Sequence, residues 1–188
     1  MGHKQEGDIV AFLTDAAQRV PSAHFRGSPR DWDGPGLYCW WVDAVGAGDL
    51  ARGIGEELHA GLLYAGQAGA GKSKSTLKSR IAFHQGRDVS SSTLRHSLAA
   101  VLHSAGDSGV TPGAPAPKAL EQKINEWMNA HLELSVCPLD ARDSLKEQET
   151  QVLAKLDPPF NLKGMPITPF RARLKFLRKQ FKKLAMSR

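Results

Sequence analysis

The sequence contains few cysteines and no long hydrophobic run, and each absence excludes a class of protein. Only two cysteines occur in 188 residues, Cys39 and Cys137, and each lies within an apolar stretch. This pattern favours two buried thiols over a disulfide or a pair of metal ligands. No segment has the apolar length needed to cross a bilayer, and the first residues lack the hydrophobic core of a signal peptide. We therefore expect a cytoplasmic protein with no membrane partner.

The length and composition are those of a globular protein. With 41% hydrophobic and 23% charged residues, a chain of this size can bury one ordinary core with extensions, but not two full domains. The formal net charge is +6. A net charge alone does not identify a polyanionic partner, because many basic proteins bind none, so its distribution along the chain is more informative.

Hydrophobic spacing and turn residues predict a small sheet flanked by helices. Strands are expected at 36–45, 61–65 and 131–137, the first two as an antiparallel pair. Helices are expected at 9–19, 49–59, from 75 or 76 onward, 91–103, 119–129, 140–156 and from 168 onward. Loops rich in glycine, proline or serine are expected at 21–35, 66–75 and 105–117. The predicted fold class is α+β with a three-stranded antiparallel sheet, rather than alternating β-α-β units.

The last part of the chain predicts a basic amphipathic helix. Residues 170–188 contain no Asp or Glu. One face carries an apolar stripe that should pack on the domain, formed by Phe170, Leu174, Leu177, Phe181 and Leu184. The opposite face carries only cations, Arg171, Arg178, Lys179, Lys182 and Lys183. A face of single sign on a basic protein favours contact with phosphates over simple solvation, and a membrane-surface helix is a weaker competitor.

The chain accordingly divides into three predicted parts. Residues 1–35 form an N-terminal helix and loop extension, residues 36–165 form the central domain, and residues 166–188 form the basic helix packed on it.

A Walker-like string is the most conspicuous motif. Gly66–Ser73 fits G-x-x-x-x-G-K-S between a predicted strand and a predicted helix. A nucleotide-binding P-loop domain would also need further parallel strands, one of them ending in an Asp that holds Mg²⁺, and too few strands remain to build such a sheet. The segment is better interpreted as a flexible basic loop, in which Lys72 and Lys74 could contact a DNA phosphate.

A second set of polar residues fits phosphodiester chemistry. Arg80 and His84 are four residues apart, so they project from one face of a helix. Glu149 lies on a later predicted helix and Asn161 follows an Asp-Pro-Pro-Phe turn. Hydrolysis needs a cation near the phosphate oxygens, a metal that offsets developing charge and a base that activates water. Arg80 can supply the first and Glu149 can ligate a hard divalent cation, although an Arg-x-x-x-His face also occurs on ordinary solvated helices.

These residues together resemble the GIY-YIG nuclease family. Gly36-Leu37-Tyr38 resembles the first motif and Tyr64-Ala65-Gly66 the second. The resemblance continues in the same order with Arg80 and His84 on the next helix, Glu149 on a later helix, and Asn161. Leu37 and Ala65 stand where the family has isoleucines. The insertion at 46–60 resembles restriction-type members, and the loop at 67–75 is expanded.

The resemblance implies a mechanism and a substrate. It implies an endonuclease that hydrolyses double-stranded DNA with one Mg²⁺ or Mn²⁺ held by Glu149 and water. Tyr38 would act as general base or orient the attacking water, and Arg80 would bind the scissile phosphate. Tyr64 and His84 would assist proton movement or phosphate contact, and Asn161 would mainly brace the site. Double-strand cleavage by one active site per chain would favour a homodimer or sequential nicking.

Two other functions stay open at this point. A nucleic-acid-binding module on the same fold would bind DNA without cutting it, and a P-loop protein would bind a nucleotide through Gly66–Ser73. The intact set of Tyr, Arg, Glu and Asn favours the nuclease over both.

Overall fold

The computed structural model describes residues 6–27, 32–86, 89, 91–106 and 117–186. The strands are β1 (Val20–Pro21), β2 (Gly36–Val42), β3 (Gly61–Ala68) and β4 (Leu132–Pro138). The α-helices are α1 (Glu6–Thr14), α2 (Ala44–Ile54), α3 (Leu77–His84), α4 (Thr93–Ser104), α5 (Pro117–His131), α6 (Leu145–Leu156) and α7 (Pro169–Met186). Two short 3-10 helices, η1 (Ala16–Gln18) and η2 (Ser22–Gly27), flank β1.

The four strands form one antiparallel sheet in the order β1-β4-β2-β3. The predicted α+β class is confirmed, but the predicted number of three strands is wrong for the described residues. The fourth strand, β1, consists of two residues, Val20 directly after the predicted helix and Pro21 at the start of the predicted loop. A two-residue edge strand that contains Pro21 carries no alternating pattern that a sequence could reveal, because proline is tolerated only at a sheet edge.

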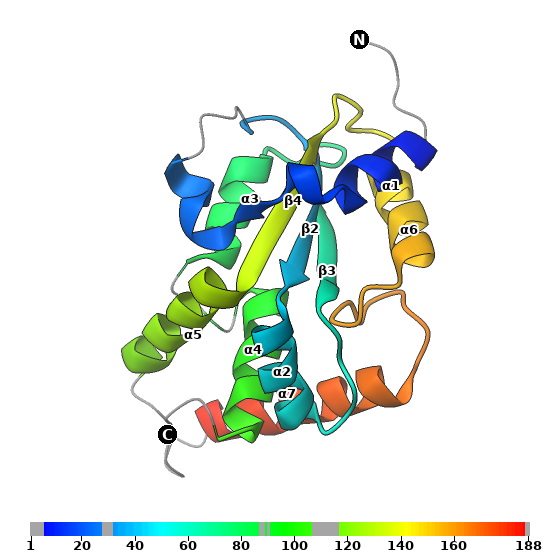
Figure 1. The fold of residues 1–188 in the computed structure, drawn as a ribbon. Coiled ribbons are helices and arrows are strands. Elements are labelled where there is room, and N and C mark those ends of the chain that lie inside the picture. The colour runs from blue at the N-terminus through cyan, green and yellow to red at the C-terminus, as the bar shows by residue number, and fades with distance from the viewer. Residues whose placement is uncertain (1–5, 28–31, 87–88, 90, 107–116, 187–188) are drawn as a thin grey trace.

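Helices cover both faces of the sheet (Figure 1). Alternate residues of β2 point to opposite faces. Tyr38, Trp40 and Val42 belong to the larger core cluster, which includes residues of α2, α3, α4, α5 and α7. Leu37 and Cys39 belong to a second cluster with residues of α1 and α6. Because β2 is buried on both faces, its sequence is apolar throughout, as expected of a central strand.

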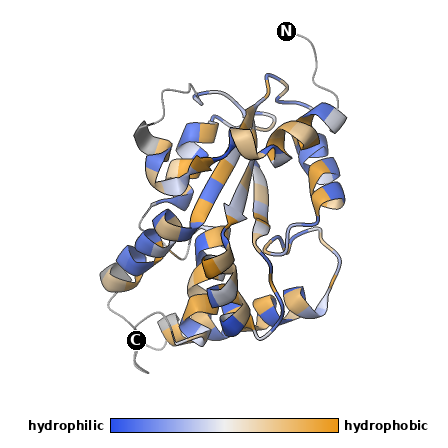
Figure 2. Cartoon of the chain, in the orientation of Figure 1, coloured by the Kyte–Doolittle hydropathy of each residue, from blue (hydrophilic) through white to orange (hydrophobic). Residues whose placement is uncertain are grey.

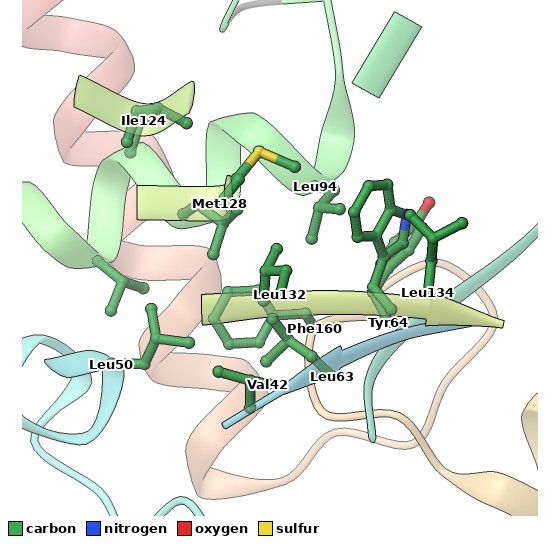
Figure 3. Packing of buried hydrophobic residues seen from close by; sticks show 14 of the residues in the cluster. Val42, Leu50, Leu63, Tyr64, Leu94, Ile124, Met128, Leu132, Leu134 and Phe160 are labelled. Carbon is green, nitrogen blue, oxygen red and sulfur yellow. The ribbon is translucent and has the colours of Figure 1, made fainter. Parts of the chain in front are cut away.

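The larger cluster joins strands, helices and the segment after α6. In Figure 3 the side chains of Val42, Leu63, Leu132 and Phe160 lie together in this core, with Leu50 of α2 nearby. Figure 2 shows hydrophobic positions gathered along the inner sides of the helices around the sheet. Burial of these apolar faces, at roughly 25 cal/mol per Å², therefore holds the sheet and the helices in one body.

Several predicted boundaries shift in the structure. The insertion between the tyrosine motifs forms its helix earlier than expected, because the Asp43 side chain accepts a hydrogen bond from the Gly46 amide and caps α2 at Ala44. The helix predicted from residue 140 begins at Leu145, and the first helix ends at Thr14. The helix expected from residue 75 or 76 is capped by Thr76, as predicted. Most of the predicted loop at 105–117 lies outside the described residues.

Both cysteines are buried thiols, as predicted. Burial, with the neighbouring Cys137, raises the pKa of Cys39 to about 12, so this thiol is unreactive. Among the described residues, every helix is too short or too polar to span a bilayer.

Candidate active site

The two tyrosines lie on the same face of neighbouring strands. Tyr38 pairs with Gly66, and Trp40 pairs with Tyr64, so the tyrosines are diagonal neighbours across β2 and β3. Tyr38 is 1% exposed and Tyr64 is 7% exposed. A Cβ atom added to Gly66 would lie 2.6 Å from the Tyr38 hydroxyl oxygen. The glycine of the Tyr-Ala-Gly motif therefore makes the room that the first tyrosine occupies.

Helix α3 brings Arg80 and His84 to these tyrosines. A capping box between Thr76 and Ser79 fixes the start of the helix, and Leu77 and Ile81 anchor it in the core. Arg80 is half-buried. His84 is fully buried, and its Nε2 lies 2.7 Å from the Tyr38 hydroxyl. The predicted common face of Arg80 and His84 is thus turned toward the tyrosines rather than toward solvent.

Glu149 of α6 completes the group from the other side of β3. Its carboxylate is half-buried. Burial raises the pKa of Glu149, whereas the charges of Arg80, Lys163 and Lys146 and a hydrogen bond from the Gln67 backbone lower it. Glu147, the nearby alternative, is exposed. The structure therefore places Glu149, and not Glu147, within electrostatic reach of the site.

The cluster holds its tyrosines and histidine neutral and its arginine charged. Burial raises the pKa of Tyr38 far above its ordinary value, and nearby Tyr64 and Glu149 raise it further, against the opposing effect of Arg80. Burial raises the pKa of Tyr64 in the same way. Burial lowers the pKa of Arg80, but Tyr38, Tyr64 and Glu149 outweigh this effect and raise it overall. Positive charge is therefore concentrated beside two phenols and one carboxylate.

Asn161 braces the edge strand that carries Tyr64. Its Oδ1 accepts a hydrogen bond from the Ala65 amide and its Nδ2 donates to the Ala65 carbonyl, both at 2.9 Å. The Phe160 amide donates to the Leu63 carbonyl one step further along β3. The segment after α6 thus satisfies outward-facing backbone groups of an edge strand, and Asn161 contributes two of these hydrogen bonds.

Arg171 was predicted to contact DNA from an exposed face of α7, but its side chain is buried. It is 5% exposed, and its guanidinium donates to the Asn161, Pro158, Pro166 and Asp157 carbonyls and to the Asp157 carboxylate. The physical reason is the spacing to Leu174, which places Arg171 beside the apolar stripe of α7. The residue therefore holds the turn that carries Asn161.

We expect Arg171→Met to destabilise the protein by about 2–4 kcal/mol, because it leaves several carbonyls and one carboxylate without their shared donor. Urea denaturation of the purified variant measures this loss. Lys175→Met changes an exposed residue of the same helix and should stay within roughly 0.5 kcal/mol of the wild type. Equal stability of the two variants would contradict the assigned role of Arg171.

The other predicted DNA-contacting residues lie on two surfaces. Lys72 and Lys74 are exposed in the loop between β3 and α3, and Arg142 holds this loop by donating to the Gly69 and Ser73 carbonyls. On α7, Lys179, Lys182 and Lys183 are exposed. Arg178 is half-buried, and its charge lowers the pKa of Tyr64. Arg178 is therefore close enough to act on the tyrosine site itself.

The Walker-like string does not have the geometry of a phosphate-binding loop. Gly66–Ala68 belongs to an antiparallel strand, and α3 begins only at Leu77. The Gly71 amide donates to the Arg142 carbonyl and the Ala70 amide donates to the Gln67 side chain. Amides that are already bonded within the protein cannot also cradle phosphates.

The donor set at the site is suited to a cation held by few protein ligands. The described residues contain no group of three or more His, Cys, Asp or Glu side chains placed to hold a metal ion. Mg²⁺ commonly keeps several waters and binds through one or two carboxylates together with substrate phosphates. A single carboxylate, that of Glu149, is enough for this mode of binding.

Sequence reasoning missed two residues behind His84, the N-cap residue of α4 and a residue of its first turn. Ser92 lies 2.8 Å from His84 Nδ1, and Arg95 donates to the His84 carbonyl. Both residues are 0% exposed. A serine before a helix indicates an N-cap, but nothing in the sequence shows that this cap reaches the histidine of the preceding helix.

An antiparallel sheet that carries two buried tyrosines on neighbouring strands, beside an arginine and a glutamate, is not a doubly wound nucleotide-binding fold. The family model of the GIY-YIG catalytic domain matches residues 36–180, which include every residue of the cluster and most of α7. The chain belongs to the GIY-YIG family. Comparison with curated proteins and with solved structures found no match.

Membership implies a nuclease-type enzyme that hydrolyses phosphodiester bonds in a nucleic-acid substrate. Members of the family generally use a divalent metal ion.

Proposed function

We propose that the protein is an endonuclease that cuts double-stranded DNA with Mg²⁺ or Mn²⁺. The observation that carries this proposal is the meeting of Arg80 and Glu149 at the two buried tyrosines, where each charge shifts the pKa of both phenols. A phosphate bound between these groups would contact a cation, a metal-ligating carboxylate and a hydroxyl group that can donate or accept a proton. Hydrolysis of a phosphodiester needs these three elements.

Each side chain has a distinct role in this proposal. Arg80 binds the nonbridging oxygens of the scissile phosphate and offsets their growing charge. Tyr38 orients the attacking water, or acts as its general base while its own proton passes to His84 Nε2, 2.7 Å away. Tyr64 contacts the phosphate or the leaving oxygen, His84 supports Tyr38, and Asn161 keeps Tyr64 in position through β3. Glu149 holds the metal ion, which supplies Lewis-acid stabilisation when bound.

The basic residues of α7 are proposed to contact phosphates of the DNA backbone beside the site. Lys179 and Lys182 are exposed on the helix whose Arg178 acts on Tyr64. Contacts to phosphates carry no sequence information, but they contribute affinity through counterion release. Lys72 and Lys74 are proposed to contact the backbone on the other side of β3.

Replacing Lys179 and Lys182 together by alanine should weaken DNA binding at moderate salt. The slope of log affinity against log salt should fall by about 1 for each phosphate that the variant no longer neutralises. Fluorescence anisotropy with a labelled duplex in EDTA measures both quantities. Lys123→Ala, which removes an exposed cation from α5, is the matched control. An unchanged slope in the double variant would remove α7 from the interface.

A DNA-binding module that does not cut is the alternative, and one experiment separates the two functions. Labelled DNA and RNA duplexes of the same sequence are incubated with the protein in EDTA and in Mg²⁺. The proposal predicts that the protein binds the DNA duplex in EDTA and cleaves it in Mg²⁺. Salt-sensitive binding without cleavage would favour the alternative, and cleavage of the RNA duplex alone would change the substrate. Because the described residues of each chain form one such site, double-strand cuts would arise from sequential nicks or from a homodimer.

A further inference from the structure

Phe83 is an aromatic residue on the solvent side of α3, beside Arg80. It is 40% exposed, whereas Leu77, Ile81 and His84 of the same helix are buried. Arg80 lies one turn earlier, and its Cζ is 5.3 Å from the centroid of the Phe83 ring, within the range of a cation–π contact. The helix therefore presents a half-buried guanidinium and an aromatic ring side by side, with the ring further out toward solvent.

Exposure alone does not make this ring a binding site, because single exposed hydrophobic residues are common on protein surfaces. In the described part of the chain, the other exposed large hydrophobic residues are Val45, Ile167, Phe176 and Leu184. Phe83 differs from them by its contact with Arg80, whose charge lowers the pKa of both site tyrosines. The Phe83 ring therefore lies at the rim of the candidate active site.

A nucleic acid carries an aromatic group close to every phosphate. The base is separated from its own phosphate by one sugar, so two neighbouring protein groups can bind the phosphate and the base together. The Tyr38 side of the Arg80 guanidinium is buried, so a phosphate reaches Arg80 from the solvent side, where Phe83 lies. The adjoining base can then stack on the exposed part of the ring, and such stacking accepts any base.

We propose that Phe83 is a stacking platform for a nucleobase next to the phosphate bound by Arg80, so that the protein prefers duplex DNA with an unpaired base at this point. The proposal rests on the proposed nuclease function for the identity of that phosphate. A base within an intact duplex is already stacked and paired, and freeing it has a cost that is least for an unpaired or mismatched base. An unpaired base therefore gains the most from Phe83.

Photocrosslinking identifies the side chain on which the base stacks. A DNA duplex with one bulged 5-iodouracil is bound to the protein in EDTA and irradiated, which links this base to an aromatic ring in contact with it. Trypsin cuts after Arg80 and Arg87, so Phe83 is the only Phe, Tyr or Trp in the peptide 81–87. We expect the label on Phe83 and its loss in Phe83→Ala. A label confined to Tyr38 or Tyr64 would overturn the proposal.

The affinities for a bulged and a fully paired duplex measure the preference. Phe83→Ala should weaken binding of the bulged duplex by roughly five- to a hundredfold, the usual effect of losing one stacked base, and leave binding of the paired duplex nearly unchanged. Phe83→Trp keeps a ring and should retain the preference. Phe176→Ala is the matched control, because Phe176 is 48% exposed and lies 5.4 Å from the Arg173 guanidinium. This variant should also retain the preference.

The same measurements separate stacking from other roles of the ring. Equal affinity of the wild type and Phe83→Ala for the bulged duplex would contradict the proposal, and slower cleavage by this variant would then mean that Phe83 only orients Arg80. A wild-type protein that crosslinks through Phe83 but cuts no nucleic acid with Mg²⁺ or Mn²⁺ would contradict the proposed function and leave the stacking role standing. A protein that cuts DNA without a crosslink at Phe83 would do the opposite.

Discussion

Replacing Glu149 by glutamine is expected to abolish cleavage, with the rate falling by more than about a hundredfold. Glutamine keeps the shape of the side chain but removes the negative charge that a hard divalent cation requires. Because burial already raises the pKa of Glu149, losing this charge should not destabilise the fold. DNA binding in EDTA should persist, since that state contains no metal ion.

The control for this prediction lies two residues earlier on the same helix. Glu147 is exposed, so Glu147→Gln should cut at nearly the wild-type rate. Single-turnover cleavage of a labelled duplex in Mg²⁺, with a thermal melt of each variant, gives rates and stabilities side by side. If Glu149→Gln cleaved as fast as Glu147→Gln, the metal ion could not be held at this carboxylate.

Arg80→Ala is expected to lower the cleavage rate by roughly 10²–10³-fold, the usual effect of removing one charged or polar group that stabilises the developing charge. The same change removes the cation that favours ionisation of Tyr38, so proton transfer should also suffer. Arg80→Lys restores the charge without the planar pair of donors, and should recover only part of the rate.

Lys78 provides the comparison for Arg80. It lies on the same helix, but its ammonium is exposed and pairs with Asp33 at 3.5 Å, so Lys78→Ala should have little effect on the rate. Single-turnover rates at saturating protein isolate the bond-breaking step from DNA binding. A rate for Arg80→Ala within about threefold of the Lys78→Ala rate would exclude Arg80 from transition-state stabilisation.

The sequence was informative where short motifs occur in a fixed order. Tyr38 and Tyr64 could be assigned to adjacent antiparallel strands, and Arg80 and His84 to one face of the next helix, from periodicity and the family resemblance alone. Glu149 was distinguished from Glu147 by its separation from Asn161, and the structure brings it to the tyrosines. Their roles in catalysis stay predictions, because side-chain positions do not measure rates.

The parts that could not be predicted depend on contacts between segments. The short strand β1 has no periodic pattern. It forms because Val20 pairs with Leu134 on β4. Ser92 reaches His84 only through the particular path of the chain between α3 and α4. Arg171 carried a usable signal, since its spacing to Leu174 and Arg178 follows one side of a helix. Counting it among the solvent-facing cations overlooked that an arginine beside an apolar stripe can be buried if carbonyls satisfy it.

The central claim is tested most directly by incubating supercoiled plasmid with the wild-type protein in Mg²⁺, in Mn²⁺ and in EDTA. We expect nicked and then linear plasmid with either metal ion, no product in EDTA, and no product from Glu149→Gln in any condition. A folded wild-type protein that binds the plasmid but leaves it intact with both ions would contradict the account. Cleavage that proceeds equally well in EDTA would contradict it too.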